Sequence, residues 1–507
     1  MFPLILSLLF LLLIGIILFR IHNNNTHFVR RKLPPGPFPL PIIGSIHLLG
    51  NHPHRVLDKL SKVYGPIMSI RLGNVETVVL SSSEATKLFL GTHDEVFCSR
   101  PQMQASKFLS YGTKGIAFAE YGPHWRSMRK LCTMELLSSA KLSGYSNMRK
   151  EEIELSVDEV RASSMNNKVV NLSEVASRLI EKMTFRMLFG KKSYKESGFH
   201  RVVEESSQVV GAFNLADYVP LLAPLDLQGL TRRIKLISKE CDNMLETIIK
   251  DHERDIDTTL LRANDDDDHM CFIDVLLSLE RQHLNSQGDQ SYSIDKGILK
   301  AVLLDLIVGA GDASSTSIEW VLSVLIKYPR VMKKLRQELK DVVGEKKMVD
   351  EKDLRNLSYL EMIIKETFRL YPTAPLLVPR ASTKDVIING YHIPKKTHVL
   401  VNFWAFGRDS NIWSETCDDF MPERFLDEEI DLYGQDFELI PFGVGRRGCP
   451  GLKLGLINTG LVVSQLVHSF DWDLPNGMSP SDLNMDERFG LSMPRAKPLL
   501  AVPTYRL

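Results

Sequence analysis

The chain opens with a long uninterrupted apolar run. Residues 2–19 are consecutive positions in which Ser7 carries the only side chain that forms hydrogen bonds. A helix of this length spans about 27 Å, close to the roughly 30 Å hydrocarbon core of a bilayer. Basic residues follow the run and none precedes it, which is the opposite of a cleaved signal peptide. We therefore predict one transmembrane anchor at 2–19, with the bulk of the chain on the cytosolic side.

A basic and proline-rich segment, residues 20–44, follows the predicted anchor. It carries three consecutive basic residues at 30–32 and then the run Leu33–Pro37 with its three prolines. Proline fixes φ and lacks an amide proton, so this stretch cannot continue the anchor helix. It is predicted to be a stiff strut between the membrane and a globular domain at residues 45–507.

Helical periodicity dominates that domain. Pro123 opens a helix that runs to about residue 137, and further helical stretches cover 147–160, 172–190 and 231–255. A much longer pattern runs from Ser293 to Lys327, about 50 Å of helix, until Pro329 stops it.

Alternating segments predict two hairpins. The first pairs Ile67–Leu72 with Val75–Leu80 around Gly73-Asn74, and the second pairs Val386–Ile388 with His392–Val401 around Asn389-Gly390. Both turns need residues that tolerate positive φ. No internal repeat or second linker interrupts the pattern, so we expect one large, mainly helical domain with small β-sheets.

Composition narrows the function. The 507 residues carry 62 basic and 62 acidic side chains, which gives no electrostatic reason to expect nucleic acid as a partner. The six cysteines are scattered, with no CxxC pair. This spacing excludes a zinc ribbon and a disulfide scaffold, and it favours a reducing compartment.

One of these cysteines lies in an unusual setting. Residues 442–451 read FGVGRRGCPG, which places Cys449 among glycines that permit a tight loop with backbone amides turned toward a thiolate. Two arginines precede the cysteine, and positive charge lowers a thiol pKa. Helical periodicity resumes at residues 452–467. A thiolate at a helix N-terminus is suited to ligate a haem iron.

This decapeptide resembles the haem-binding loop of cytochrome P450 enzymes, FxxGxRxCxG. Other marks of that family follow in order over essentially the whole chain after the anchor. The resemblance implies the cytochrome P450 fold, haem b as cofactor and Cys449 as the axial ligand of its iron. Phe442, which opens the loop, is then also a cofactor-binding residue.

A second mark is the ExxR sequence of Glu366 and Arg369, which share one face of a helix that ends before Pro372. Alone, such a pair is a common surface feature worth under 1 kcal/mol. In the family, the pair is buried and bonds to an arginine of a PERF-like segment, here Arg424. The resemblance therefore implies that these three side chains are structural and support the haem loop.

A third mark implies how haem propionates are held. Trp125 and Arg129 lie one turn apart on the helix that Pro123 opens. The resemblance places both on a propionate, together with Arg447 and, more weakly, Arg380.

The fourth mark lies in the long helix and departs from the family. The pattern A/G-G-x-D/E-T places an acid and an alcohol over the iron to relay protons to dioxygen. This chain keeps Asp312 but has Ala313 where threonine is expected. Ser314 follows, about 100° round the helix, so its hydroxyl would not superpose. We expect Asp312 to help deliver protons without the usual alcohol, so the proton relay departs from the family pattern.

Further details resemble the plant A-type microsomal enzymes, among them the LPPGP strut and Phe489-Gly490-Leu491. The resemblance implies a haem-thiolate monooxygenase anchored in the endoplasmic reticulum membrane. It would insert one oxygen atom from O2 into a lipophilic plant specialised metabolite, aromatic or terpenoid. The expected pocket is mostly apolar and comprises Pro101–Ala119, Phe213–Ala216, Leu303, Leu306, Ile307, Ala310, Thr373–Val378 and Leu491.

The resemblance also implies electrons from an NADPH-dependent reductase. No GxGxxG follows a strand in this chain, so we expect NADPH to bind that partner. Docking is expected on a basic face near the haem loop, with Arg129, Lys130, Arg446 and Lys453 as candidates. Two other functions stay open. The same fold could act as a dehydratase or isomerase, for instance on an aldoxime, which Ala313 would suit. The chain could also be a membrane haem protein that binds a ligand without turnover.

Overall fold

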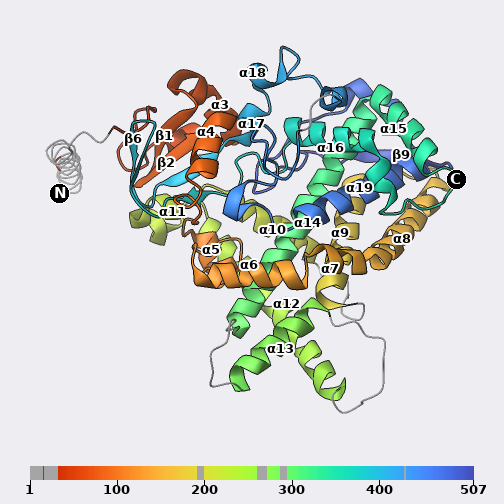
Figure 1. The fold of residues 1–507 in the computed structure, drawn as a ribbon, viewed down its shortest axis with the longest axis horizontal. Helices are drawn as coiled ribbons and strands as arrows, with labels where there is room; N and C mark the ends of the chain where they lie inside the picture. The colour runs from red at the N-terminus through yellow and green to blue at the C-terminus, as the bar shows by residue number, and fades with distance from the viewer. Residues whose placement is uncertain (1–14, 16–31, 191–198, 260–270, 286–293, 427–429) are drawn as a thin grey trace, which may run out of the picture.

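A 32-residue helix, α14 (Lys296–Lys327), runs through the middle of the molecule (Figure 1). The side chain of Asp295 caps it by accepting the Ile298 amide at 2.7 Å, which sets its start slightly later than the predicted Ser293. The helix ends at Lys327, as predicted from Pro329, and Pro329 is the first residue of the next helix. The structure is a computed structural model that describes residues 15, 32–190, 199–259, 271–285, 294–426 and 430–507.

Helices account for most of the described chain, which confirms the mainly helical prediction. The longer helices are α3 (Pro53–Tyr64), α6 (Pro123–Glu135), α8 (Ser146–Ser164), α9 (Leu172–Phe189), α10 (Phe199–Gly211), α12 (Leu230–Thr259), α13 (Phe272–Asn285), α15 (Pro329–Val342), α16 (Ser358–Leu370) and α19 (Leu452–Ser469). The shorter ones are α2 (Ile46–Leu49), α4 (Ser83–Thr86), α5 (Gln104–Leu109), α7 (Ser139–Gly144), α11 (Leu215–Tyr218), α17 (Phe403–Phe406) and α18 (Ser410–Trp413).

The strands form small sheets at the edges of the helical body. One sheet has the order β1-β2-β7-β4, in which β2 and β7 are parallel and the other pairs antiparallel. A second has the order β3-β9-β8, and β5 pairs with β6 alone. Their bounds are β1 (Ile67–Leu72), β2 (Val75–Leu80), β3 (Val170–Asn171), β4 (Arg380–Ala381), β5 (Val386–Ile388), β6 (Tyr391–Ile393), β7 (His398–Val401), β8 (Phe470–Asp473) and β9 (Leu500–Tyr505).

The first predicted hairpin is confirmed, and the second is right at its first strand, β5, and at its turn. Asn389 and Gly390 both have positive φ, 50° and 73°, and join β5 to β6. The single strand predicted over His392–Val401 is wrong. Pro394 cannot donate a ladder hydrogen bond, and the chain turns at Lys396 with φ 69°. The remainder becomes β7, which pairs with β2 and β4 in the larger sheet.

Two apolar cores meet the central helix on either side of its midpoint. One packs around its C-terminal half, from Ile318 onward, and the other around its first part, up to Ile307. Between them, Gly309–Ala313 belong to neither core and keep accessible surface. A long helix that is buried at both ends and accessible at its centre marks that centre as the place to look for a site.

The segment before the domain lies against β1. Ser69 of β1 donates its amide to the carbonyl of Pro35 at 2.8 Å and its hydroxyl to that of Pro34 at 2.7 Å. In the part of the chain that the structure describes, no helix has the length and apolar character needed to cross a membrane. The anchor predicted at 2–19 lies outside the described residues, apart from Gly15.

Candidate active site

The cysteine loop is a compact turn that delivers Cys449 to the start of α19. The amide of Cys449 donates to the carbonyl of Phe442 at 2.8 Å, which closes the loop. Gly443 and Gly445 both take positive φ, 66° and 64°, which favours glycine at these positions. Gly451, immediately before α19, donates its amide to the thiol of the cysteine. The predicted helix at 452–467 is therefore present as α19, and the cysteine lies at its N-terminal end.

Trp125 and Arg129 lie one turn apart on α6 and both approach the loop. The guanidinium of Arg447 lies over the indole ring, 4.2 Å from its centroid, and that of Arg129 lies 5.8 Å from the same centroid. Arg129 also donates to the carbonyl of Gly448 at 2.6 Å, one residue before the cysteine. The structure thus brings α6 and the cysteine loop together.

Positive charge exceeds negative charge around this contact. Arg100 and Arg380 are buried beside the two arginines just described. Burial, followed by the charges of the other three arginines, lowers the pKa of Arg100. Arg380, placed by β4, contacts Asp94 at 3.1 Å, and that carboxylate also pairs with Arg446 at 2.9 Å. Asp94 thus pairs with only two of the five arginines around this contact, and the remaining positive charge suits an anionic partner with carboxylates of its own.

The surface between the loop and α14 is suited to haem b. Burial raises the pKa of the Cys449 thiol, while the Gly451 amide and the charge of Arg129 act to lower it. Cys449 nevertheless keeps accessible surface, as does Gly309 at the middle of α14. A Cβ placed on Gly309 would meet no atom within 4 Å. A soft sulfur ligand, excess guanidinium groups and accessible interior surface are the features that an iron porphyrin with two propionates needs.

The acid of α14 points toward other segments of the chain. The carboxylate of Asp312 accepts a hydrogen bond from the hydroxyl of Ser207 on α10. Burial raises the pKa of Asp312, and its contacts with Ser207 and Ser492 partly offset this. Ala313 keeps accessible surface, whereas Ser314 is buried. The side chain at the position of the expected threonine therefore offers no hydroxyl.

Glu366, Arg369 and Arg424 form a fully connected ionic group. Glu366 and Arg369 are completely buried on α16 and form a bidentate pair with distances of 2.7 and 2.8 Å. Arg424 adds bonds of 3.0 and 3.1 Å to the same carboxylate. Arg369 also donates to the carbonyls of Gly407 and Asp419 at 2.6 and 3.0 Å. The group ties α16 to the irregular chain that precedes the cysteine loop.

Besides Ser207, sequence reasoning missed two residues that shape this site. Arg100 is one, because nothing in its local sequence distinguishes it from a surface arginine. Asp305 is the other, and its position as a lone acid in the apolar run 301–308 could have revealed it. Its carboxylate accepts the amides of Ile116 and Ala117 at 2.7 and 2.9 Å. Burial raises the pKa of Asp305 to about 6.

The segments expected to line a pocket come together from distant parts of the sequence. Leu491 donates its amide to the carbonyl of Ser207 at 3.3 Å, and Met493 donates to Thr373 at 2.7 Å. Phe213 stacks on Phe489 with 6.4 Å between ring centroids. The C-terminal segment therefore bridges α10 and the chain that follows α16.

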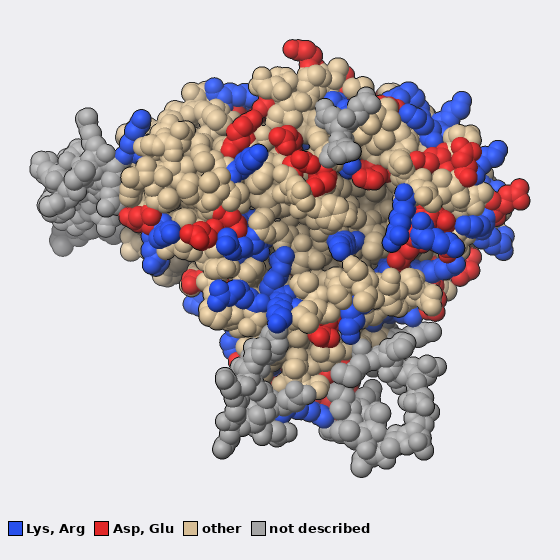
Figure 2. All heavy atoms as spheres, viewed as in Figure 1, with Lys and Arg blue, Asp and Glu red and all other residues tan. Residues whose placement is uncertain are grey.

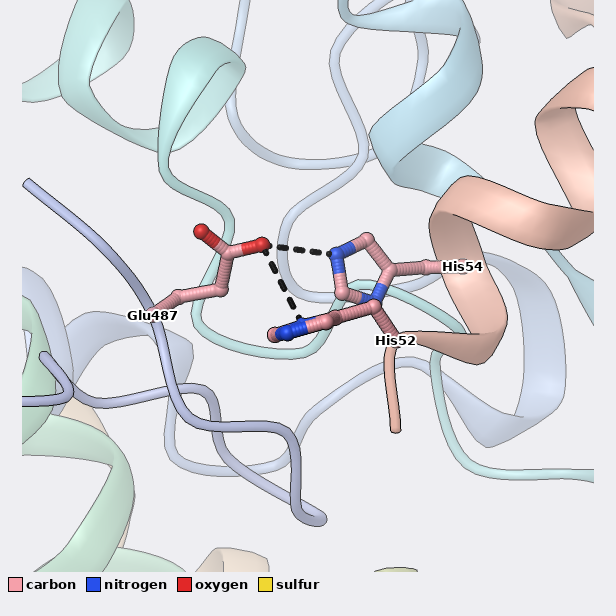
Figure 3. Close-up of side chains that lie close together, drawn as sticks. All are labelled: His52, His54 and Glu487. Atoms are coloured by element: carbon pink, nitrogen blue, oxygen red, sulfur yellow. Dashed lines mark hydrogen bonds and ion pairs between the residues drawn. The ribbon is translucent and has the colours of Figure 1, made fainter. Parts of the chain in front are cut away.

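A cluster of metal-ligand side chains lies outside this site, where α3 meets the C-terminal segment. Figure 3 shows His52 and His54 directed at Glu487 from the start of α3, with the nearer ring nitrogens 3.7 and 3.2 Å from one oxygen. Burial acts to raise the pKa of Glu487, but bonds from His54 and Arg55 outweigh it and hold the pKa at about 2. Arg55 binds both oxygens of the Glu487 carboxylate, at 2.7 and 2.6 Å. The cluster is therefore an ion-pair contact between α3 and the C-terminal segment rather than a cation site.

The fold and the geometry of the site are those of a haem-thiolate enzyme. Comparison with known proteins leads to the same class. A family model described as cytochrome P450 matches residues 34–502. The chain is 50% identical over 507 residues to cytochrome P450 CYP736A12 of Panax ginseng, with 100% of both chains covered. It is 39% identical over 499 residues to a flavonoid 3'-monooxygenase of Arabidopsis thaliana, covering 96% of this chain and 93% of the relative.

A solved structure is similar as well. A zebra fish cytochrome P450, determined with abiraterone, gives a TM-score of 0.72 at 25% identity, over 90% of this chain and 100% of the other. The chain belongs to the cytochrome P450 family. It is a cytochrome P450 monooxygenase, and its cofactor is haem b.

Proposed function

We propose that this monooxygenase inserts one oxygen atom from O2 into a lipophilic plant specialised metabolite, aromatic or terpenoid, with electrons from an NADPH-dependent reductase. The observation that carries the substrate class is the apolar character of the accessible residues at the centre of α14 and in the C-terminal segment. The expected pocket residues Leu303, Leu306 and Ile307 are buried in the core, whereas Val308 and Ala310 of α14 and Leu491 keep accessible surface. Such a surface binds uncharged ligands by excluding water. The flavonoid monooxygenase among the relatives supports the aromatic branch.

Each site residue then has a distinct task. When bound, haem b supplies the dioxygen chemistry. Cys449 would hold its iron, and the arginines around Trp125 would hold its propionates. Asp312 would hold and deliver protons at its carboxylate, from the accessible centre of α14. Glu366, Arg369 and Arg424 would fix the chain that leads into the cysteine loop without touching the substrate.

A membrane location at the endoplasmic reticulum, with the domain on the cytosolic side, is part of the proposal. Exposed apolar side chains near the turn between β1 and β2 support this location. Phe38 and Leu221 are 86% and 82% exposed. Both belong to segments that flank the turn between β1 and β2. In the segment of Phe38, Gly44 forms a β-bridge with Leu72, and in the segment before Leu221, the Tyr218 carbonyl accepts the amide of Asn74 at 2.8 Å. Membrane insertion of this end would agree with the anchor predicted at 2–19.

The reductase is proposed to dock over α6, on the side of the cysteine loop. Figure 2 shows Lys and Arg side chains gathered over this helix. Lys130 of α6 and Lys453 of α19 are exposed, and Arg446 of the loop is partly exposed beside Asp94. An acidic partner surface would be attracted here, and electrons would enter near the cysteine.

The test is product analysis in microsomes that hold the full chain and a plant reductase. They would be fed pooled lipophilic plant metabolites with and without NADPH. We expect a product that gains one oxygen only when both NADPH and dioxygen are present. Microsomes with the reductase alone are the control. A product that forms without NADPH, by loss of water or rearrangement, would overturn the proposal and favour the dehydratase or isomerase alternative.

A further inference from the structure

Two hydroxyls from separate elements hold the carboxylate of Asp312. Ser207 of α10 donates its hydroxyl to the Oδ2 atom, and Ser492 of the C-terminal segment contacts the same carboxylate. Ser492 also donates its amide to the Ser207 hydroxyl oxygen at 3.4 Å. The elements approach closely here, because a Cβ on Gly211 would lie only 2.1 Å from the amide nitrogen of Leu491. Both serines are buried.

An ion pair at the protein surface lies close to the two serines in the sequence. Glu204, one turn before Ser207 on α10, forms an ion pair with Arg488 at 2.7 Å, and both side chains are partly exposed. The charges of this pair act on Asp312 from the outside, Glu204 raising and Arg488 lowering its pKa. The buried serines thus lie between an exposed ion pair and the acid at the centre of α14.

We propose that Asp312 is reprotonated from this outer side through the hydroxyl of Ser207, which acts as a positioning residue for proton delivery. The inference rests on the proposed function, since it concerns protons that monooxygenation consumes. Ala313 leaves the accessible side of α14 without the usual alcohol, so a supply through Asp312 gains importance.

The proton balance of the step is simple. After Asp312 gives up its proton toward the accessible centre of α14, the Ser207 hydroxyl passes its proton to Oδ2 in a concerted transfer. In that same transfer a hydronium ion of the solvent, entering beside Glu204 and Arg488, gives a proton to the Ser207 oxygen and is left as water. No electrons move, and both side chains return to their starting state.

A purely structural role for Ser207 predicts something different. In that case the hydroxyl would only fasten α10 to α14, and its loss would change stability without changing proton access to Asp312. The neighbouring Ser206 provides a matched control, because it is equally buried on the same helix but its side chain meets Cys241 of α12. Ser207→Thr keeps a hydroxyl and serves as the rescue.

The experiment measures proton access directly and needs no turnover. In the haem-loaded full chain, the carboxyl stretching band of Asp312 is assigned by its loss in Asp312→Asn. Its shift after transfer to D2O is then followed over time by infrared spectroscopy. We expect Ser207→Ala to slow this exchange, and Ser206→Ala and Ser207→Thr to exchange as the unchanged protein does. Equal exchange rates in Ser207→Ala and Ser206→Ala would overturn the inference.

A second measurement links the same variants to turnover. With reductase and NADPH, the solvent isotope effect on NADPH oxidation and the peroxide released per NADPH are compared. We expect Ser207→Ala alone to raise both, and to slow product formation by less than the ~10²-fold that a general acid contributes to a rate, because water partly replaces the hydroxyl. Unchanged values in Ser207→Ala would contradict the inference. A failure of the unchanged protein to oxidise NADPH would instead count against the proposed function and leave the infrared result to decide the role of Ser207.

Discussion

The cysteine side of the site and the α14 side are built in different ways. On the cysteine side, charged groups are held by several partners each, as when Glu366 accepts bonds from Arg369, Arg424 and the amide of Met421. On the α14 side, Asp312 is held mainly by two hydroxyls from distant segments, and Ala313 offers no hydrogen bond from its side chain. The first side therefore has several charged contacts for each group that supports the cysteine loop. The second has fewer charged contacts, and it is there that the chain departs from the pattern of its family.

The largest effect is expected from the cysteine itself. Cys449→Ser replaces a soft thiolate by a hydroxyl that is a poor iron ligand. We expect complete loss of turnover and of the reduced carbon monoxide absorption band that marks thiolate-ligated haem. Retention of that band in the variant would refute the assignment of Cys449 as the iron ligand.

The next effect concerns the buried ionic group. Glu366→Gln leaves two guanidinium groups without their charged partner, which costs about 3–5 kcal/mol when such a pair is buried. We expect little folded protein, or a strongly lowered unfolding midpoint by circular dichroism. Glu361→Gln is the matched control, because Glu361 pairs with Lys365 on the same helix but is exposed. That change should cost under 1 kcal/mol. Similar losses in both variants would contradict a special role for the buried group.

The pH dependence of stability should report Asp305. Burial raises its pKa from 3.8 to about 6, so the folded protein holds a proton that the unfolded chain releases. The resulting penalty is absent below about pH 4, grows as pH rises, and is complete above about pH 6 at about 3 kcal/mol. Asp305→Asn cannot ionise, so its unfolding midpoint should improve relative to the unchanged protein from pH 4 to pH 6. A constant difference across that range would show that Asp305 does not titrate in this way.

A smaller change is expected on the α14 side. Ala313→Thr restores an alcohol next to Asp312, and we expect less peroxide released per NADPH consumed in the system reconstituted with reductase. The size of the decrease measures how far the missing alcohol limits proton delivery. Unchanged or higher peroxide release would show that the chain does not depend on a relay at this position.

The smallest effect is expected on the basic surface over α6. Lys130→Glu should weaken turnover with the reductase several-fold at low salt, and the difference should shrink as salt screens the charges. Lys333→Glu, an exposed change on α15, is the control. If turnover falls equally at all salt concentrations, docking over α6 is contradicted.

The same contrast explains what could be predicted from the sequence. The cysteine loop, the ExxR pair and the long helix are local patterns, so their positions were predicted from residues close in the chain. Ser207 and Arg100 were missed because their partners lie far away in the sequence and only the fold brings them together. The second hairpin failed for a related reason, since β7 leaves β6 to pair with β2 of the distant N-terminal sheet.

The most direct test of monooxygenation despite Ala313 is an isotope experiment. Microsomes holding the full chain and reductase would convert a substrate found by product analysis under ¹⁸O₂ with NADPH. We expect the product to carry one ¹⁸O atom, and none when H₂¹⁸O replaces labelled dioxygen. A product without the label from ¹⁸O₂, formed by dehydration or rearrangement, would contradict the proposal that this chain inserts oxygen into its substrate.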